Sequence, residues 1–281
     1  MLAAASKLPG GELPELPQLE FAVLPAANRF ITKQLFECNW AQIIEGDLDT
    51  AHFSFLHMPA PSVASTTHAH SQADEKRLRW MRDDPMPQFE LLEHECGFVV
   101  AGARNADGQK YWRMTQYLLP THGTGPSTLP GETYHGFTIV PIDDTSAWCY
   151  AYSWNPDRPL TDEERAKLSG GWALVCETDE NYVPVRNVRN DFLIDRDEQK
   201  HRTFTGVKGL AEQDSMVQHS QGPIVDRTKE ILTGTDAAVV RFRSLLLKGA
   251  RDLMEGQEPE APYRHQAFRA RPGSWLADAD K

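Results

Sequence analysis

Long apolar runs and an excess of positive charge are both missing from this chain of 281 residues. No apolar run approaches the ~20 residues that a membrane-spanning helix needs, and the short apolar start lacks the basic residues of a signal peptide. Lysine and arginine number 29 against 40 acidic residues, which gives a net charge of −11. Such a charge disfavours nucleic acids and anionic membranes as partners. We therefore expect a cytoplasmic protein that binds neither nucleic acid nor membrane.

Cysteine is scarce as well, since only Cys38, Cys96, Cys149 and Cys176 are present. No two of them have C-x-x-C spacing, and none has a histidine two or three positions later. This pattern argues against a thiolate zinc site or an iron–sulfur cluster bound by this chain. Four reduced and mostly buried thiols are expected instead.

What is present is the composition of a globular domain, with 40% hydrophobic and 25% charged residues. Prolines and glycines in residues 1–20 predict an extended lead-in, and the proline-rich, charged residues 256–281 predict an irregular tail. Residues 21–255 are expected to form the main folded domain between them.

A sheet and several helices are expected within that domain. Apolar residues recur at helical spacing from 34 to 56 and from 236 to 254, and Thr161 with Glu164 forms a capping box for a helix over 162–168. A strand is expected at 21–24 and a loop or lid at 60–88. Aromatic and β-branched residues predict antiparallel strands at 89–100, 110–119, 134–140 and 147–154. Helices before and after one sheet indicate an α+β domain.

The stretch from Cys38 to His57 carries the most chemical information. Its last thirteen residues hold three carboxylates and two histidines in otherwise apolar sequence: Glu45, Asp47, Asp49, His52 and His57. Because His52 and His57 are about 140° apart on an ideal helix, they converge on one ion only if the helix is locally loosened, for example by a π-type turn. Two imidazoles and one carboxylate form a triad that holds Fe(II) and leaves positions open for O₂ and substrate. Alternatively, both histidines are hydrogen-bonded polar side chains of a buried helix.

Two motifs resemble those of a known family. The pattern N-W-x₄-E-G-D-x-D-x₂-H-x₄-H, from Asn39 to His57, resembles the mononuclear-iron motif of Rieske non-heme iron ring-hydroxylating oxygenases. It is most similar to the branch of phthalate dioxygenase and the aromatic O-demethylases. The segment 204–230, with F-T-G-V-K-G, then Q-D at 213–214, then S-Q-G-P-I-V-D-R, resembles the downstream signature that contains the carboxylate ligand. The resemblance implies a helix-grip (START-like) fold, in which an antiparallel sheet packs around a long C-terminal helix.

The resemblance also implies roles for five residues. His52, His57 and Asp214 would be the ligands of the mononuclear Fe(II). Asp49 would be the bridge through which electrons arrive from a cluster histidine on a neighbouring subunit, and Asn39 would line the pocket.

Three nearby carboxylates compete with Asp214 for the ligand role, although flanking arginines favour solvated ion pairs for them: Asp191, Asp195 and Asp197. The tract His68-Ala69-His70 is a further metal-binding candidate.

The implied activity is that of an oxygenase in aromatic catabolism. It would use O₂ and two electrons to hydroxylate or O-demethylate an aromatic compound, with a ferredoxin or reductase as donor, in a homotrimer. The family's α subunits carry a [2Fe–2S] domain with C-x-H and C-x-x-H ligands, which this sequence lacks. The cluster is therefore expected from a missing or separate Rieske domain, whether the chain is a fragment, a split gene product or a partner protein.

Two other functions stay open. One is a helix-grip binding module that holds an apolar or aromatic ligand and no functional metal. The other is an iron or zinc hydrolase that uses the same triad.

Overall fold

One antiparallel sheet of eight strands organises the computed structural model, which describes residues 14–59, 72–125, 132–171 and 173–279. The strand order is β1-β7-β6-β5-β4-β3-β2, and β8 pairs with β4. The strands are β1 Arg29–Phe36, β2 Gln88–His94, β3 Gly97–Ala106, β4 Gln109–Leu118, β5 His122–Gly125, β6 Tyr134–Pro141, β7 Ala147–Trp154 and β8 Gly273–Asp278.

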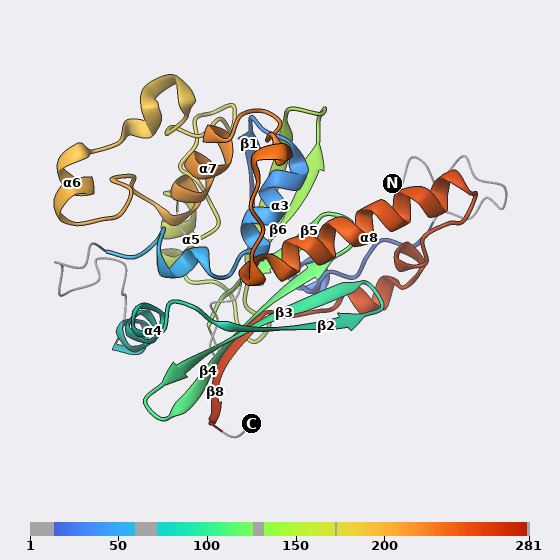
Figure 1. Ribbon diagram of the computed structural model, residues 1–281, viewed down its shortest axis with the longest axis horizontal. Helices are drawn as coiled ribbons and strands as arrows, with labels where there is room; N and C mark the ends of the chain where they lie inside the picture. Colours follow the sequence, from blue (N-terminus) through green and yellow to red (C-terminus); the bar gives the residue numbers. More distant parts are fainter. Residues whose placement is uncertain (1–13, 60–71, 126–131, 172, 280–281) are drawn as a thin grey trace.

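Helices cover the sheet and connect its strands (Figure 1). The α-helices are α2 Glu20–Val23, α3 Trp40–Leu48, α4 Gln72–Asp83, α5 Asp162–Ser169, α6 Arg196–His201, α7 Leu210–Ser220 and α8 Ala237–Met254. The 3₁₀ turns are η1 Ala26–Asn28, η2 His52–Ser54, η3 Val188–Leu193, η4 Arg227–Lys229, η5 Gly234–Asp236, η6 Ala261–Tyr263 and η7 His265–Phe268.

The main core lies between the sheet and two helices, α3 and α8. Figure 1 shows α8 crossing the front of the sheet, with α3 beside its N-terminal end. Ile44 of α3 and Phe242 of α8 are almost fully buried in one cluster with Phe98 and Tyr117 of the sheet. The apolar spacing along α8 places its buried side chains on one face, which the sheet covers. The expected α+β fold, an antiparallel sheet packed around a long C-terminal helix, is confirmed.

Several expected elements differ from the structure. The segment from Gln34 to Leu56 is not one helix, because residues 29–36 form β1, which pairs with β7 along its whole length. Residues 21–23 belong to α2 rather than to a strand, and α4 fills residues 72–83 of the expected loop. The C-terminal segment is not an irregular tail, because β8 pairs with residues 109–114 of β4. Residues 1–13, 60–71 (with His68 and His70), 126–131, 172 and 280–281 lie outside the described residues.

Other expectations are confirmed. The capping box of Thr161 and Glu164 begins α5, and the predicted strands at 110–119, 134–140 and 147–154 correspond to β4, β6 and β7. The expected strand at 89–100 is instead a hairpin, because a turn at 95–96 divides it between β2 and β3. All four cysteines are buried free thiols, and burial raises the pKa of Cys38 to about 12. Among the described helices, none has the length and apolar character to cross a membrane.

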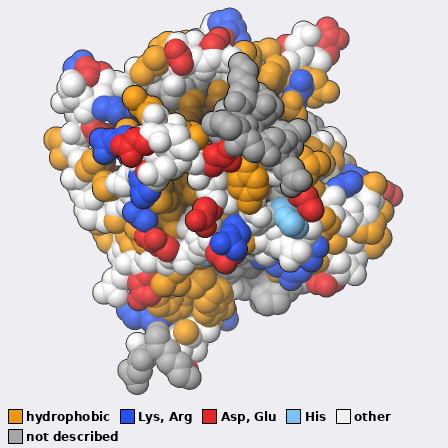
Figure 2. Space-filling view, turned by 90° about the vertical axis from the view of Figure 1, so that its right-hand side faces the viewer, with side chains coloured by type: hydrophobic (Ala, Val, Ile, Leu, Met, Phe, Trp, Pro, Cys, Tyr) orange, Lys and Arg blue, Asp and Glu red, His pale blue; other side chains and the backbone are white. Residues whose placement is uncertain are grey.

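Charge is mixed over the surface. Acidic and basic side chains are interspersed with hydrophobic ones across the face shown in Figure 2. On the described part of that face, the net negative charge is not gathered into one continuous area.

Candidate metal centre

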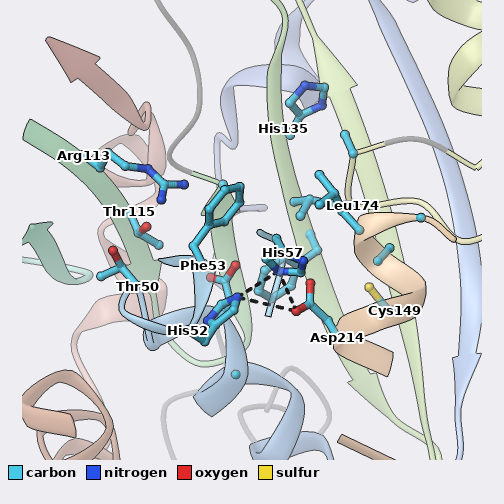
Figure 3. A pocket seen from close by; sticks show the side chains of 18 of the residues that line it. Thr50, His52, Phe53, His57, Arg113, Thr115, His135, Cys149, Leu174 and Asp214 are labelled. Atoms are coloured by element: carbon cyan, nitrogen blue, oxygen red, sulfur yellow. Dashed lines mark hydrogen bonds and ion pairs between the residues drawn. The ribbon is translucent and has the colours of Figure 1, made fainter. Parts of the chain in front are cut away.

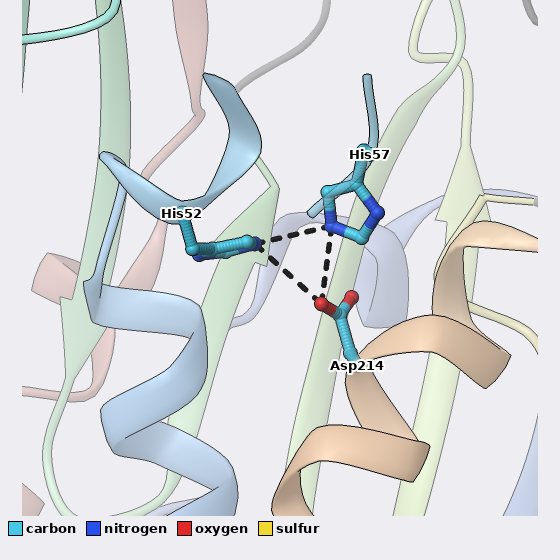
Figure 4. Close-up of side chains that lie close together, drawn as sticks. All are labelled: His52, His57 and Asp214. Carbon is cyan, nitrogen blue, oxygen red and sulfur yellow. Dashed lines mark hydrogen bonds and ion pairs between the residues drawn. The ribbon is translucent and has the colours of Figure 1, made fainter. Parts of the chain in front are cut away.

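His52, His57 and Asp214 converge at one point (Figure 4). Both histidines follow the end of α3, and Asp214 lies in α7. Nε2 of His52 and Nε2 of His57 are 3.1 Å apart, and Oδ1 of Asp214 lies 3.5 Å from the first nitrogen and 3.1 Å from the second. The histidines converge because α3 ends at Leu48 and a 3₁₀ turn follows, and not because of a π-type turn.

The donor set fits a divalent cation such as Fe(II). Donor atoms on neighbouring corners of an octahedron, with bonds of about 2.1 Å, lie about 3 Å apart. The three observed separations, 3.1, 3.1 and 3.5 Å, are close to this value. Two imidazole nitrogens and a carboxylate oxygen direct lone pairs at one another, an arrangement that a cation or proton between them stabilises. All three residues also line a cavity, so a cation that they held would be accessible from it.

Hydrogen bonds fix the two imidazoles. His57 is 4% exposed, and its Nδ1 lies 2.7 Å from Oε1 of Gln213. Nδ1 of His52 contacts the backbone oxygen of Asp49. Burial lowers the pKa of His52. Burial also acts to lower the pKa of His57, but the charge and hydrogen bonding of Asp214, together with the hydrogen bond to Gln213, raise it overall. Each ring is therefore oriented through Nδ1, which leaves Nε2 for a metal.

Asp49 lies directly before the turn that carries His52. It caps the C-terminus of α3, and its Oδ1 accepts hydrogen bonds from the backbone N–H of Ala51 (2.9 Å) and of His52 (3.3 Å). Its Oδ2 lies 4.0 Å from Nδ1 of His52. The carboxylate therefore shapes the turn, and its part in electron transfer stays a prediction.

Asn39 has a different place from the expected one. Its Oδ1 accepts a hydrogen bond from the backbone N–H of Ala41 and so caps the N-terminus of α3, while its Nδ2 donates to the backbone oxygen of Asp144. The residues that line the cavity do not include it. The expected pocket role is corrected to helix capping, for which asparagine after a strand is a familiar signal.

The competing carboxylates lie outside the triad. Asp191 pairs with Arg196 at the surface, and Asp195 caps α6. Asp197 is exposed, 3.7 Å from His201. His219 is buried, and its Nε2 accepts a hydrogen bond from the backbone N–H of Glu37. Among the described carboxylates, Asp214 is the one that meets both histidines.

A cavity of about 570 Å³ opens beside the triad. Its wall includes His52, His57 and Asp214 together with apolar and aromatic side chains. A second cavity of about 200 Å³ shares Asp49, His52 and Asp214 with it. The aromatic residues that line the larger cavity are Phe36, Phe53, Tyr111 and Phe137.

One wall of this cavity is polar. Arg113 is 2% exposed, its guanidinium lies 4.4 Å from the ring centre of Phe53, and its Nη1 lies 3.1 Å from Sδ of Met81. Among the described residues, no carboxylate pairs with it, and burial lowers its pKa. The buried hydroxyls of Thr50 and Thr115 have no hydrogen-bond partner there. In Figure 3 these three side chains lie on one side of Phe53, with His57 and Asp214 on the other.

Sequence reasoning missed this polar wall. Thr50 comes from the turn after α3, and Arg113 and Thr115 come from β4. No local pattern joins them, because only the pairing of strands and the packing of α3 bring them to one surface. Their alternation along β4 is the one signal, since residues two apart face the same side of a sheet.

Comparisons with known proteins agree with the two motifs. Residues 8–267 match a family described as LigXa C-terminal domain like. The chain is 34% identical over 279 residues to the phthalate 4,5-dioxygenase oxygenase subunit of Pseudomonas putida, covering 93% of this chain and 61% of that protein. It is 31% identical over 279 residues to the 3-chlorobenzoate-3,4-dioxygenase oxygenase subunit of Comamonas testosteroni, covering 94% and 63%. The chain thus spans about three fifths of the length of these curated relatives.

Solved structures include similar chains at low identity. A crystal structure of dicamba monooxygenase bound to dicamba matches with a TM-score of 0.48 at 12% identity, over 86% of this chain and 64% of that one. A structure of Pseudomonas putida CBB5 NdmA with caffeine matches with a TM-score of 0.48 at 13% identity, over 92% and 59%.

Proposed function

The chain belongs to the family of LigXa C-terminal-like domains, and from this premise we propose that it is the catalytic domain of a Rieske-type oxygenase acting on an aromatic acid. The resemblance to the phthalate dioxygenase branch is confirmed by the family match and by relatives that are oxygenase subunits. The activity itself is our proposal, because the chain spans only part of those relatives.

One observation carries the proposal. The three donor atoms of His52, His57 and Asp214 lie within 4.8 Å of one another on the wall of a large cavity. They come from segments 157 residues apart, since 214 − 57 = 157. Two histidines and a carboxylate that came together by chance would not be expected to line a cavity large enough for an aromatic ring.

The residues of the site would have different roles. His52, His57 and Asp214 would hold Fe(II), which when bound supplies the activation of O₂. Gln213 fixes the ring of His57, and Asp49 would mark the entry of electrons beside His52. The phenylalanines of the cavity exclude water and would orient an aromatic ring.

The polar wall favours a carboxylate-bearing substrate. Arg113 is a buried guanidinium that no described carboxylate neutralises, and Thr50 and Thr115 add two buried hydroxyls without partners. Leaving such groups unpaired costs free energy, which an incoming carboxylate would offset. Phthalate and chlorobenzoate, in the names of the relatives, are aromatic carboxylates of this kind.

Electrons would come from outside this chain. Its four cysteines are buried thiols without cluster spacing, so a [2Fe–2S] Rieske centre has to be supplied by another domain or protein, itself served by a reductase or ferredoxin. A homotrimer would place a cluster of one subunit beside Asp49 of the next.

Oxygen incorporation tests the proposal. The Fe(II)-loaded chain is supplied with a Rieske-type donor, its reductase, a methoxybenzoate or benzoate, and ¹⁸O₂. We expect ¹⁸O in a new ring hydroxyl, or formaldehyde release from the methoxy group. If an iron-loaded chain with a donor proven on another oxygenase gives neither product from any aromatic acid, the oxygenase proposal is wrong, and the metal-free binding module becomes the better explanation.

A further inference from the structure

Asp47 is the one carboxylate of the E-G-D-L-D segment that has neither a role in the proposed chemistry nor an ion pair with a described residue. It lies in α3 and lines the large cavity. A Cβ atom added to Gly123 of β5 would come 2.9 Å from its Oδ2 and would clash with the ring of Phe137. The glycine therefore leaves the space that the Asp47 carboxyl fills, against an aromatic wall.

Its two neighbours in the segment are fully engaged. Glu45 accepts hydrogen bonds from Arg243 and Arg227, each at 2.8 Å, and Asp49 caps the turn before His52. Asp47 makes no hydrogen bond or ion pair with any residue that the structure describes. Burial, and then the nearby Asp214 carboxylate, raise its pKa well above the ordinary value.

An unpaired carboxyl that faces a cavity is an unfilled hydrogen-bonding site. Asp47 is half-buried, and shielding such a group from bulk water without a partner is unfavourable, so the cavity contents have to satisfy it. A carboxyl accepts a hydrogen bond in either protonation state. A hydroxyl or amino donor therefore suits Asp47, whereas a second carboxylate next to it would be repelled or would have to take up a proton.

Asp47 and Arg113 line the same cavity next to different parts of β4. Asp47 contacts the region of Gly123, which pairs with Tyr117 of β4. Arg113 is four residues earlier on the same strand, since 117 − 113 = 4, which is about 13 Å of strand. An aromatic acid whose carboxylate meets Arg113 would thus direct its far ring edge toward Asp47.

We propose that Asp47 binds a hydroxyl or amino substituent of the aromatic acid that Arg113 holds. The preferred substrates are then hydroxy- or aminobenzoates, and aromatic dicarboxylates are selected against. This inference rests on the proposed function, because it takes the carboxylate at Arg113 as given.

Calorimetric titration of the full chain tests it without any turnover. The probes are benzoate, 3-hydroxybenzoate, 4-hydroxybenzoate, isophthalate and terephthalate, with Asp47→Leu, the near-isosteric Asp47→Asn, and Asp226→Asn as an exposed carboxylate control. At least one hydroxybenzoate should bind about tenfold more tightly than benzoate. Asp47→Leu should remove that advantage and leave the benzoate Kd nearly unchanged. Asp47→Asn should improve dicarboxylate binding, and Asp226→Asn should change nothing.

The outcomes distinguish a failure of this inference from a failure of the proposed function on which it rests. If benzoate binds and depends on Arg113, but hydroxyl groups give no advantage or keep it in Asp47→Leu, the role of Asp47 is overturned and the carboxylate subsite stands. If no aromatic acid binds the unmodified chain, both are overturned. Because the readout is a difference between two ligands on one variant, a general loss of folding would not imitate the expected result.

Discussion

Nδ1 of His57 donates a hydrogen bond of 2.7 Å to Oε1 of Gln213, the residue next to Asp214. The direction follows from the amide, because Nε2 of Gln213 already donates to the backbone oxygen of Val207 at 2.8 Å. Gln213 is 1% exposed, so its orientation is fixed by packing as well. One side chain therefore sets the tautomer of His57 and ties it to the helix that carries the carboxylate.

Replacing Gln213 should weaken metal binding. Gln213→Leu removes the acceptor and frees the His57 ring, and we expect Fe(II) affinity to fall by about 10- to 100-fold. Competition with a chelator of known affinity measures the change. Gln257→Leu, an exposed site, is the matched control. Equal affinity in Gln213→Leu and the unmodified chain would mean that Gln213 does not hold the ligand in place.

Replacing Asp49 should slow electron transfer to the site without reducing metal binding. Asp49→Asn keeps an oxygen that can accept from the backbone N–H of Ala51 and His52, so the turn and the iron content should be retained. The rate at which a Rieske-type donor oxidises in the presence of substrate and O₂ should fall by about tenfold or more. Stopped-flow absorbance of the donor measures it. An unchanged rate with full iron would exclude Asp49 as the bridge.

Arg113 should govern the binding of aromatic acids. Arg113→Met removes the charge but keeps an apolar stem, and the Kd for benzoate should rise by about 10- to 100-fold. Arg113→Lys should give an intermediate value, since a point charge replaces the planar fork. Arg165→Met, which removes hydrogen bonds that Arg165 of α5 donates to the backbone oxygens of Ala27 and Arg29, is the control. If calorimetry gave the same Kd for benzoate in the unmodified chain and in all variants, the carboxylate subsite at Arg113 would be contradicted.

Stability should fall in mild acid. Burial lowers the pKa of His135 and of His219 to about 4, while the unfolded value is about 6.5. The unfolded chain binds more protons between these values, so the contribution of the neutral rings is complete above pH 6.5 and is lost as the pH falls toward 4. Each ring should cost about 1 kcal/mol of unfolding free energy between about pH 7.5 and 5.5.

Urea unfolding at several pH values measures this slope. His135→Gln and His219→Gln should each flatten it, because glutamine does not titrate. If both variants kept the slope of the unmodified chain, these two histidines would not be its source.

Two local signals in the sequence predicted helices correctly, whereas the apolar spacing over 34–56 did not. The Thr161–Glu164 capping box and the apolar spacing along 236–254 depend on residues within a few positions, and both helices are present. β1 and β8 were missed because their strand character comes from pairing with β7 and β4, far away in the sequence. A strand that pairs at a distance has no obligatory local pattern of its own.

In the candidate site, too, features set by neighbouring residues were predictable, and features set by distant residues were not. The spacing of His52 and His57 pointed to a metal, but it could not supply Asp214, which came from the resemblance alone. The convergence depends on where α3 ends, a detail that periodicity does not fix. The capping role of Asn39 was predictable from residue type, yet the family resemblance assigned it to the pocket.

The metal content of the purified chain after anaerobic Fe(II) addition and desalting tests the assignment of the three ligands. It is measured together with acid-labile sulfide, for the unmodified chain and for His52→Ala and Asp214→Ala. The arrangement of His52, His57 and Asp214 predicts close to one iron per chain without sulfide, and loss of that iron in both variants. An unmodified chain that retains no iron, or variants that retain it fully, would contradict the mononuclear site.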